Sequence, residues 1–227
     1  MGAQPVMGKT RIWDLPTRLF HWALVACVVC LVVTGNIGGA AMEWHFLLGY
    51  AVFTLLLFRL VWGFVGGYWS RWWQLPLSWP SIHAYWQGRA DARLTAGHNP
   101  LGSWSVLFLL GWLALQVGTG LVSDDEIATS GPLVAFVSGT LVSAATAWHK
   151  GVGKGLLIAW VVLHVLAIVW HKVRKGQALV PAMLHGDKRL NAPLPASRDN
   201  RASRLLALVI LVLCAVCVRW VVSLGAT

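Results

Sequence analysis

Residues 19–34 read LFHWALVACVVCLVVT, an apolar stretch without a charged side chain. A helix needs about 20 such residues to cross a bilayer, and helices are favoured because backbone in lipid must satisfy its own hydrogen bonds. Four further stretches have the same character. The sequence therefore predicts five transmembrane helices, at roughly Leu19–Thr34, His45–Phe64, Leu101–Val122, Val152–His171 and Leu205–Leu224. Pro16 could open the first of them earlier.

The composition of the whole chain agrees with this interpretation. Of its 227 residues, 57% are hydrophobic and only 11% are charged, and the mean hydropathy is +0.66. Soluble proteins are about 45–50% apolar and about 25% charged. A water-soluble enzyme, a disordered chain and a secreted disulfide scaffold are therefore excluded. We expect an all-α integral membrane protein with a single membrane domain over residues 1–227.

Lysine and arginine gather on one side of this topology. The N-terminus, the loop after the second span and the loop after the fourth hold most of the 18 basic residues, whereas only Lys150 and Lys154 fall on the opposite side. Basic loops stay in the cytoplasm, so we expect a multi-pass cell-membrane protein with a cytoplasmic N-terminus and a C-terminus on the opposite side. The net charge of +10 then reflects topology and anionic lipid, and no nucleic-acid partner is expected.

Two further segments are apolar or aromatic but too short to be spans. Pro132–Trp148 contains Ser, Thr and Gly, and a crossing there would move the most basic loop to the other side. We therefore interpret it as a re-entrant or interfacial hairpin on the outer face. Trp69–Gly88 carries five tryptophans, which favour the headgroup level, so we expect it to lie at the inner interface.

Four histidines fall within or at the ends of the predicted spans, at two depths. His45 and His149 lie near the outer ends of their helices, and His21 lies near the inner end of the first. His164 follows His149 by fifteen residues, which is about 22 Å of helix rise and about four turns. The two imidazoles therefore share roughly one face, and the four histidines form an outer pair, His45 with His149, and an inner pair, His21 with His164.

Two stacked bis-histidine sites in a helical bundle suit two haem b groups, because haem iron accepts axial imidazoles and bundle cores hold cofactors between facing side chains. The chain has no C-x-x-C-H motif, which excludes covalent c-type attachment. Zinc would need ligands that converge on one point. The alternative for each histidine is a hydrogen bond to a backbone carbonyl or a wet position at the interface.

Several motifs occur in order along the chain: WDLPTRLFHW at 13–22, EWH at 43–45 with GY at 49–50, FRLVWGF at 58–64, GHNPLG at 97–102, WH at 148–149 and LH at 163–164. As an ordered set over residues 10–186, they resemble the bacterial dihaem cytochrome b family of the cytochrome b561 type. This family includes the cytochrome b subunits of nickel–iron hydrogenases. The resemblance implies a four-helix transmembrane bundle that holds two haems over residues 10–186, with residues 204–224 as an extra C-terminal helix.

Carried over residue by residue, the resemblance implies His21, His45, His149 and His164 as the axial iron ligands. The interval from His149 to His164 is one residue longer than is usual in the family, and a bulge or an unwound turn among the glycines after His149 could absorb it. His171 is the rival of His164 for the inner site. It lies on the same face, but at the water boundary.

Two arginines are candidates for binding haem propionates. Arg18 and Arg59 lie near the inner ends of their helices, and a guanidinium group can bind a planar carboxylate with two hydrogen bonds. The alternative for each is that the side chain reaches toward lipid phosphate at the inner leaflet.

These features predict a dihaem b-type cytochrome that transfers electrons across the membrane. The resemblance implies quinone or quinol on one side and a periplasmic redox partner, such as a c-type cytochrome, on the other, so an activity as a quinol:cytochrome c oxidoreductase is left open. One alternative is the membrane-anchoring cytochrome b subunit of a nickel–iron hydrogenase. Another, of a different class, is a haem-free membrane anchor or transporter with a histidine proton relay, which would require buried carboxylates that the spans lack.

Overall fold

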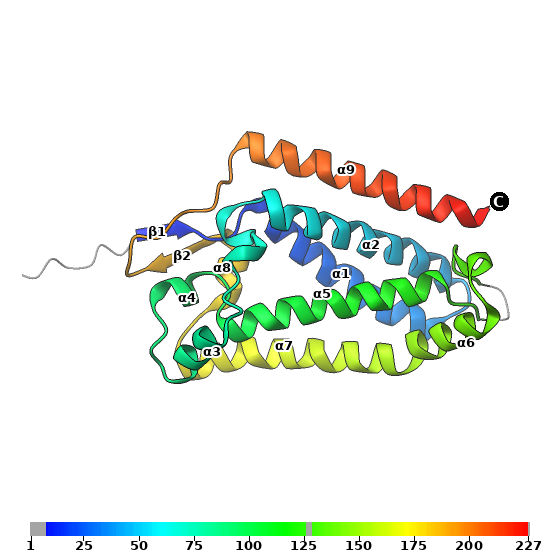
Figure 1. Ribbon diagram of the computed structural model, residues 1–227, viewed down its shortest axis with the longest axis horizontal. Helices are drawn as coiled ribbons and strands as arrows, with labels where there is room; N and C mark the ends of the chain where they lie inside the picture. Colours follow the sequence, from blue (N-terminus) through cyan, green and yellow to red (C-terminus); the bar gives the residue numbers. More distant parts are fainter. Residues whose placement is uncertain (1–7, 126–128, 227) are drawn as a thin grey trace, which may run out of the picture. The chain divides into compact units, whose positions relative to one another are not determined.

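The computed structural model describes residues 8–125 and 129–226 and is mostly helical (Figure 1). The long helices are α1 (Leu15–Ile37), α2 (Ala41–Val65), α5 (Pro100–Leu121), α7 (Lys154–Lys175) and α9 (Arg201–Ser223). The short ones are α3 (Trp79–Trp86), α4 (Ala92–Ala96), α6 (Gly139–Trp148) and α8 (Leu179–His185). Single helical turns are η1 (Tyr68–Ser70), η2 (Trp72–Gln74), η3 (Val134–Phe136), η4 (His149–Gly153) and η5 (Leu224–Ala226), and the strands are β1 (Gly8–Arg11) and β2 (Asp187–Leu190).

Five helical stretches in the described residues are long and apolar enough to cross a membrane. They correspond to the five predicted spans, which confirms the all-α membrane fold. Most are a few residues longer than predicted. The first begins at Leu15 rather than Leu19, because Asp14 caps the helix: its Oδ1 accepts a hydrogen bond from the backbone N–H of Thr17 at 2.8 Å.

The hairpin predicted for Pro132–Trp148 is wrong in its form. After the short turn η3, the segment folds into α6, which continues through η4 into α7 (Figure 1). Ten residues of helix rise only about 15 Å, so α6 alone is too short to span a bilayer. The segment therefore adds no sixth span, and it extends the fourth one with a bend.

The chain divides into two compact units, and each long helix contributes to both. We call residues 8–20, 59–108 and 164–208 the sheet unit, because they include β1 and β2. Residues 21–58, 109–125, 129–163 and 209–226 form the second unit, which we call the cavity unit for the site described below.

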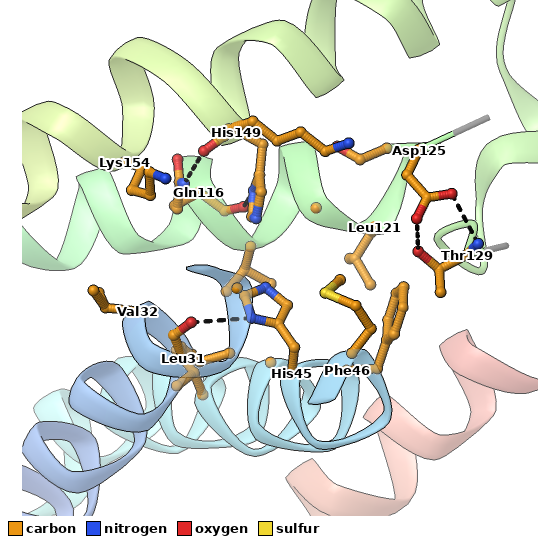
Figure 2. Close-up of a pocket in the computed structure, with 18 of the residues that line it drawn as sticks. Leu31, Val32, His45, Phe46, Gln116, Leu121, Asp125, Thr129, His149 and Lys154 are labelled. Atoms are coloured by element: carbon orange, nitrogen blue, oxygen red, sulfur yellow. Dashed lines mark hydrogen bonds between the residues drawn. The ribbon is translucent and has the colours of Figure 1, made fainter. Parts of the chain in front are cut away.

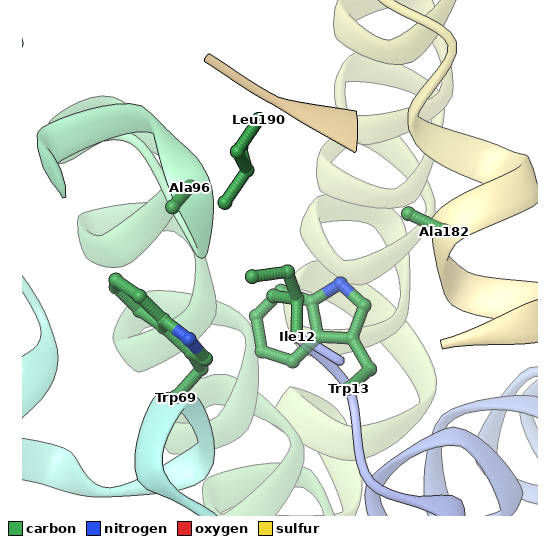
Figure 3. Close-up of a cluster of buried hydrophobic side chains, with 6 residues drawn as sticks. All are labelled: Ile12, Trp13, Trp69, Ala96, Ala182 and Leu190. Carbon is green, nitrogen blue, oxygen red and sulfur yellow. The ribbon is translucent and has the colours of Figure 1, made fainter. Parts of the chain in front are cut away.

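In the sheet unit, β1 and β2 pair antiparallel, with Gly8 opposite Leu190 and Arg11 opposite Asp187. Ile12 and Trp13 directly follow β1 and are buried in a small hydrophobic core (Figure 3). The other members of this core are Trp69, Ala96, Ala182 and Leu190. It joins the start of the chain to segments far along the sequence, and so positions the beginning of α1.

Asp14 is fully buried at this junction. Besides capping α1, its carboxylate accepts hydrogen bonds from Trp62 Nε1 at 3.2 Å, Gly67 N at 3.1 Å and Ser70 Oγ at 2.7 Å. A buried carboxylate is tolerated when its lone pairs are satisfied in this way. Asp14 therefore ties the beginning of α1 to the end of α2 and to the turn that follows.

Residues 191–200, the linker-like stretch before α9, are held by specific hydrogen bonds. Ser197 Oγ donates to the carbonyl of Ile12 at 2.6 Å and accepts from the backbone N–H of Trp69 at 3.3 Å. Asp199 pairs with Arg11 at 3.0 Å and with Arg204 at 2.9 Å. The stretch thus connects α9 to the same core that positions α1.

Candidate functional site

A cavity of about 430 Å³ lies within the cavity unit, lined by segments of α1, α2, α5 and the η4–α7 junction (Figure 2). Its walls are mostly apolar, with Val28, Leu31, Phe46, Val52, Leu113 and Leu157 among the lining residues. A largely apolar pocket that contains a few convergent polar groups is the usual form of a cofactor site. The central polar groups here are two histidines.

His45 from α2 and His149 from η4 face each other across this cavity (Figure 2). Their ring centroids are 6.1 Å apart and their planes are at 84°. Imidazole nitrogens bind metal ions at about 2 Å, so one metal ion between two such rings would hold their centroids roughly 6 Å apart. The outer pair expected from the sequence is therefore brought together.

Both rings are oriented through Nδ1 by a carbonyl of the neighbouring helix. Nδ1 of His45 lies 3.1 Å from the carbonyl oxygen of Leu31 in α1, and Nδ1 of His149 lies 2.8 Å from that of Gln116 in α5. A carbonyl can only accept, so each neutral ring carries its proton on Nδ1 and its lone pair on Nε2. Histidines that bind metals are held in this way.

The two neighbouring helices share a short pattern that sequence reasoning missed. A Thr-Gly pair follows each accepting carbonyl at the third and fourth positions: Thr34-Gly35 in α1 and Thr119-Gly120 in α5. The threonine hydroxyls lie 3.3 Å and 3.4 Å from the same Nδ1 atoms. A Cβ at either glycine would come within 2.9 Å of Cε1 of the facing imidazole. Each glycine thus makes the room that the ring occupies.

His149 begins the turn that joins α6 to α7. This turn, η4, is π-helical, and Gly151 has the non-helical angles φ −100° and ψ −105°. A π turn accommodates an extra residue, which confirms the predicted bulge. Two side chains of α5 hold it: Gln116 Nε2 donates to the carbonyl of His149 at 2.8 Å, and Trp112 Nε1 donates to that of Gly153 at 3.0 Å. Sequence reasoning missed both side chains, although the amide of Gln116 within an apolar span was a signal.

The donor set fits a haem. In the part of the chain that the structure describes, no group of three or more His, Cys, Asp or Glu side chains could hold a metal ion by itself. Two opposed imidazoles instead complete the coordination of an iron whose other ligands come from a porphyrin. The apolar walls suit the macrocycle. Gly49 also lines the cavity, and a Cβ there would meet nothing within 4 Å.

The inner pair falls in different units, His21 in the cavity unit and His164 in the sheet unit, so their pairing stays a prediction. The ring of His21 makes an edge contact with Trp22, with the ring centroids 5.1 Å apart. His164 is partly buried in α7.

His171, the rival of His164, uses both ring nitrogens for hydrogen bonds within the sheet unit. Its Nδ1 lies 2.8 Å from the carbonyl of Ala167. Its Nε2 lies 3.0 Å from Tyr85 Oη and 3.3 Å from Asn99 Nδ2. His171 would have to give up its contacts with Tyr85 and Asn99 before Nε2 could bind iron, which favours His164 as the inner ligand.

The two candidate arginines have different surroundings. Arg59 is only 4% exposed, and its guanidinium group stacks 4.1 Å from the ring centroid of Trp72. Among the described residues, its Nη1 atom is buried without a hydrogen-bond partner. Nε of Arg18 is likewise buried without a hydrogen-bond partner among the described residues, but its guanidinium group already donates to the carbonyl of Leu184 at 2.6 Å and lies 3.9 Å from the carboxylate of Asp199. Arg59 is therefore the better candidate for an additional anionic ligand.

Comparison with known proteins gives a family for this arrangement. The sequence profile of prokaryotic cytochrome b561 matches residues 12–186. The chain belongs to the prokaryotic cytochrome b561 family. This cytochrome b561 is thus a multi-pass membrane protein of the b-type cytochromes, a class of electron-transport proteins that use b-type haem.

Several curated proteins are similar to this cytochrome b561 over most of their length. The "Probable Ni/Fe-hydrogenase 1 B-type cytochrome subunit" of Escherichia coli K12 is 27% identical, with 77% of this chain and 88% of that protein covered. The corresponding subunits of Azotobacter vinelandii and Cupriavidus necator are 26% and 24% identical, with 82% and 78% of this chain and 91% and 86% of those proteins covered. No solved structure matches the chain significantly.

Proposed function

We propose that this cytochrome b561 carries two haem b groups and transfers electrons across the bacterial inner membrane. The observation that carries the proposal is the His45–His149 pair, two opposed imidazoles with both Nδ1 atoms bonded to carbonyls. These residues are the proposed axial ligands of the outer haem. Bound haem would supply a one-electron iron couple, and two axial histidines would leave the iron no open position.

His21 and His164 are the proposed ligands of the inner haem. Their depths in the predicted spans and the hydrogen bonds that occupy His171 support this choice. Arg59 is the proposed partner of an inner propionate, because a buried guanidinium group favours an anion. Arg18 remains a candidate for the same role. Residues 10–186 then form the haem-binding core, with 204–224 as an additional helix of a single membrane domain.

The experiment that tests this proposal is a reduced-minus-oxidised spectrum of the purified protein together with its haem stoichiometry. We expect two non-covalent haem b per chain, extractable with acidified acetone. Loss of His21 should remove one haem and leave the outer one intact. A colourless protein would favour the haem-free anchor or transporter.

We further propose that the periplasmic partner is a nickel–iron hydrogenase and that quinone is the membrane-phase partner. The similar proteins named as hydrogenase cytochrome subunits favour a hydrogenase over a c-type cytochrome. The two can be separated in native membranes. If the hydrogenase is the partner, H₂ should reduce the b-type haem, and deletion of the hydrogenase should abolish this reduction. Reduction by a c-type cytochrome in the deletion strain would support the other partner.

The proposed orientation places the N-terminus in the cytoplasm and the C-terminus in the periplasm. The concentration of Lys and Arg in three predicted loops supports it. Reporter fusions test it directly. An alkaline phosphatase fused after α9 should be active, and the same enzyme fused in the segment between α3 and α4 should be inactive.

A further inference from the structure

Two lysines line the His45–His149 cavity. Lys150 belongs to η4 and Lys154 begins α7, so both follow His149 closely, and both are among the lining residues. Two acidic residues, Asp124 and Asp125, line the same cavity. Asp125 accepts two hydrogen bonds from Thr129, from its backbone N–H at 2.9 Å and its hydroxyl at 2.6 Å. Most residues that line the cavity are thus apolar, but the lining also includes two basic and two acidic side chains.

The Lys154 ammonium group is held in place by a neutral partner. Its Nζ atom donates to Oδ1 of Asn36 in α1 at 3.1 Å, so the bond fixes the side chain without neutralising its charge. Among the described residues, the ion pairs are those of Arg11, Arg18 and Arg204 with acidic groups, and neither lysine takes part in one. Both cations therefore remain available to an anion in the cavity.

The position of these lysines is unusual for the chain. In the proposed orientation, both lie toward the periplasmic end of the fourth span, where Arg219 near the end of α9 is the one other basic residue of the 18 in the sequence. Positive charge on that side opposes the normal distribution in membrane proteins, and lysine near the bilayer is costly unless it meets water or an anion. Both nevertheless lie at the one cavity that contains the facing imidazoles.

We propose that Lys150 and Lys154 form a carboxylate-binding subsite of this cavity and bind the two propionates of the outer haem. The inference rests on the proposed function, since it needs a haem between His45 and His149. It extends that function by giving the outer haem its own cations, separate from Arg59. Asn36 is a positioning residue, because it holds the Lys154 ammonium group through its amide oxygen.

A nearby cation favours the reduced form of a haem, because reduction adds a negative charge. The variants Lys150→Gln and Lys154→Gln test the subsite, because glutamine removes the positive charge and keeps a polar side chain. We expect each variant to lower the midpoint potential of the outer haem, which is the haem that His149→Ala removes. The expected shift is at most about 59 mV, which for a one-electron couple equals a tenfold fall in the ratio of reduced to oxidised haem. Lys172→Gln, near the other end of α7, is the matched control and should leave the potential of the outer haem unchanged.

Each other outcome has a definite meaning. If the double variant keeps both midpoint potentials at wild-type values, the subsite is wrong although the dihaem function stands. If Lys154→Gln releases the outer haem, Lys154→Arg should restore it, and failure of arginine to do so also overturns the proposal. A wild-type protein without haem would contradict the proposed function itself, and the subsite with it.

Discussion

His45 and His149 face each other at a ring-centroid distance of 6.1 Å, and each ring is aimed by a carbonyl of a helix other than its own. The axial geometry therefore depends on the packing of α1 against α2 and of α5 against η4. Because Thr34-Gly35 and Thr119-Gly120 repeat the same support on both sides, the two halves of the site are built alike.

His45→Ala and His149→Ala should each remove the same haem. Each residue supplies one of the two protein bonds that would hold the outer haem, so either change would remove half of its protein ligands. We expect the haem content to fall from two to one per chain in either variant and in the double variant, measured by haem extraction and the reduced-minus-oxidised spectrum. The combination of His45→Ala with His21→Ala should leave none.

His185→Ala is the control for these variants, because His185 ends α8 in the sheet unit and lies outside the cavity. It should retain both haems. If His45→Ala and His149→Ala together lost two haems while each alone lost one, the residues would serve different sites and the pairing would be wrong.

Gly120→Ala should disturb the site, whereas Gly111→Ala on the same helix should not. The new Cβ at position 120 would lie 2.9 Å from Cε1 of His149, but at position 111 it would meet nothing within 4 Å. Overpacking of this kind costs about 1–3 kcal/mol, while alanine inside a helix gains roughly 0.5–1 kcal/mol over glycine. Thermal release of haem, followed by absorbance, should therefore occur at a lower temperature only in Gly120→Ala. Equal release temperatures would show that the ring can shift at no cost.

The helices and the outer histidine pair could be predicted from sequence because they depend on local properties. Long apolar stretches mark the spans, and His45 and His149 stand at matching depths in them. The position of the bulge after His149 was likewise predictable from the local glycines and the long interval to His164.

The supports of the site could not be predicted, because they depend on contacts between distant segments. Gln116 is distinctive as an amide within the apolar span Leu101–Val122, but the sequence does not show that its side chain and its carbonyl both bind His149. The repeated Thr-Gly pair was a visible signal, but its meaning depends on which helix lies opposite. The sequence likewise identifies Asp14 only as a possible helix cap, because the hydrogen bonds from Trp62 and Ser70 to its carboxylate depend on the folded chain.

Gln116→Leu should loosen the π turn. It removes the donor to the carbonyl of His149, and an unsatisfied buried acceptor costs about 1–3 kcal/mol. The backbone carbonyl of residue 116 still accepts from Nδ1, so the outer haem should be retained but released at a lower temperature. Gln177→Leu, between α7 and α8, is the control and should leave haem release unchanged. Identical release from both variants would mean that the turn is stable without this bond.

Asp199→Asn should destabilise the sheet unit at neutral pH and have little effect in acid. The Asp199 side chain is only 6% exposed and accepts from Arg204 at 2.9 Å. Burial alone would raise the pKa of this carboxyl, but the hydrogen bonds from Arg204 and the backbone of Leu15, with the charges of Arg204 and Arg11, lower the pKa on balance. The folded state therefore binds the proton on this carboxyl less tightly than the unfolded state does. The ion pairs stabilise the fold fully above pH 3.8, the ordinary pKa of the carboxyl. This stabilisation is lost as the pH falls through the lower pKa of the folded state.

The measurement is thermal unfolding of the wild type and of Asp199→Asn at neutral pH and at a pH well below 3.8. The difference in melting temperature should be largest at neutral pH and should shrink toward zero in acid. Asp91→Asn is the matched control: Asp91 caps α4 through a hydrogen bond to Leu94 N at 2.8 Å, and asparagine caps helices equally well, so its effect should not follow this pH dependence. If the difference in melting temperature between the wild type and Asp199→Asn stayed the same in acid, the destabilisation would come from packing of the carboxamide. It would then not come from the loss of the charge that holds residues 191–200 against Arg11.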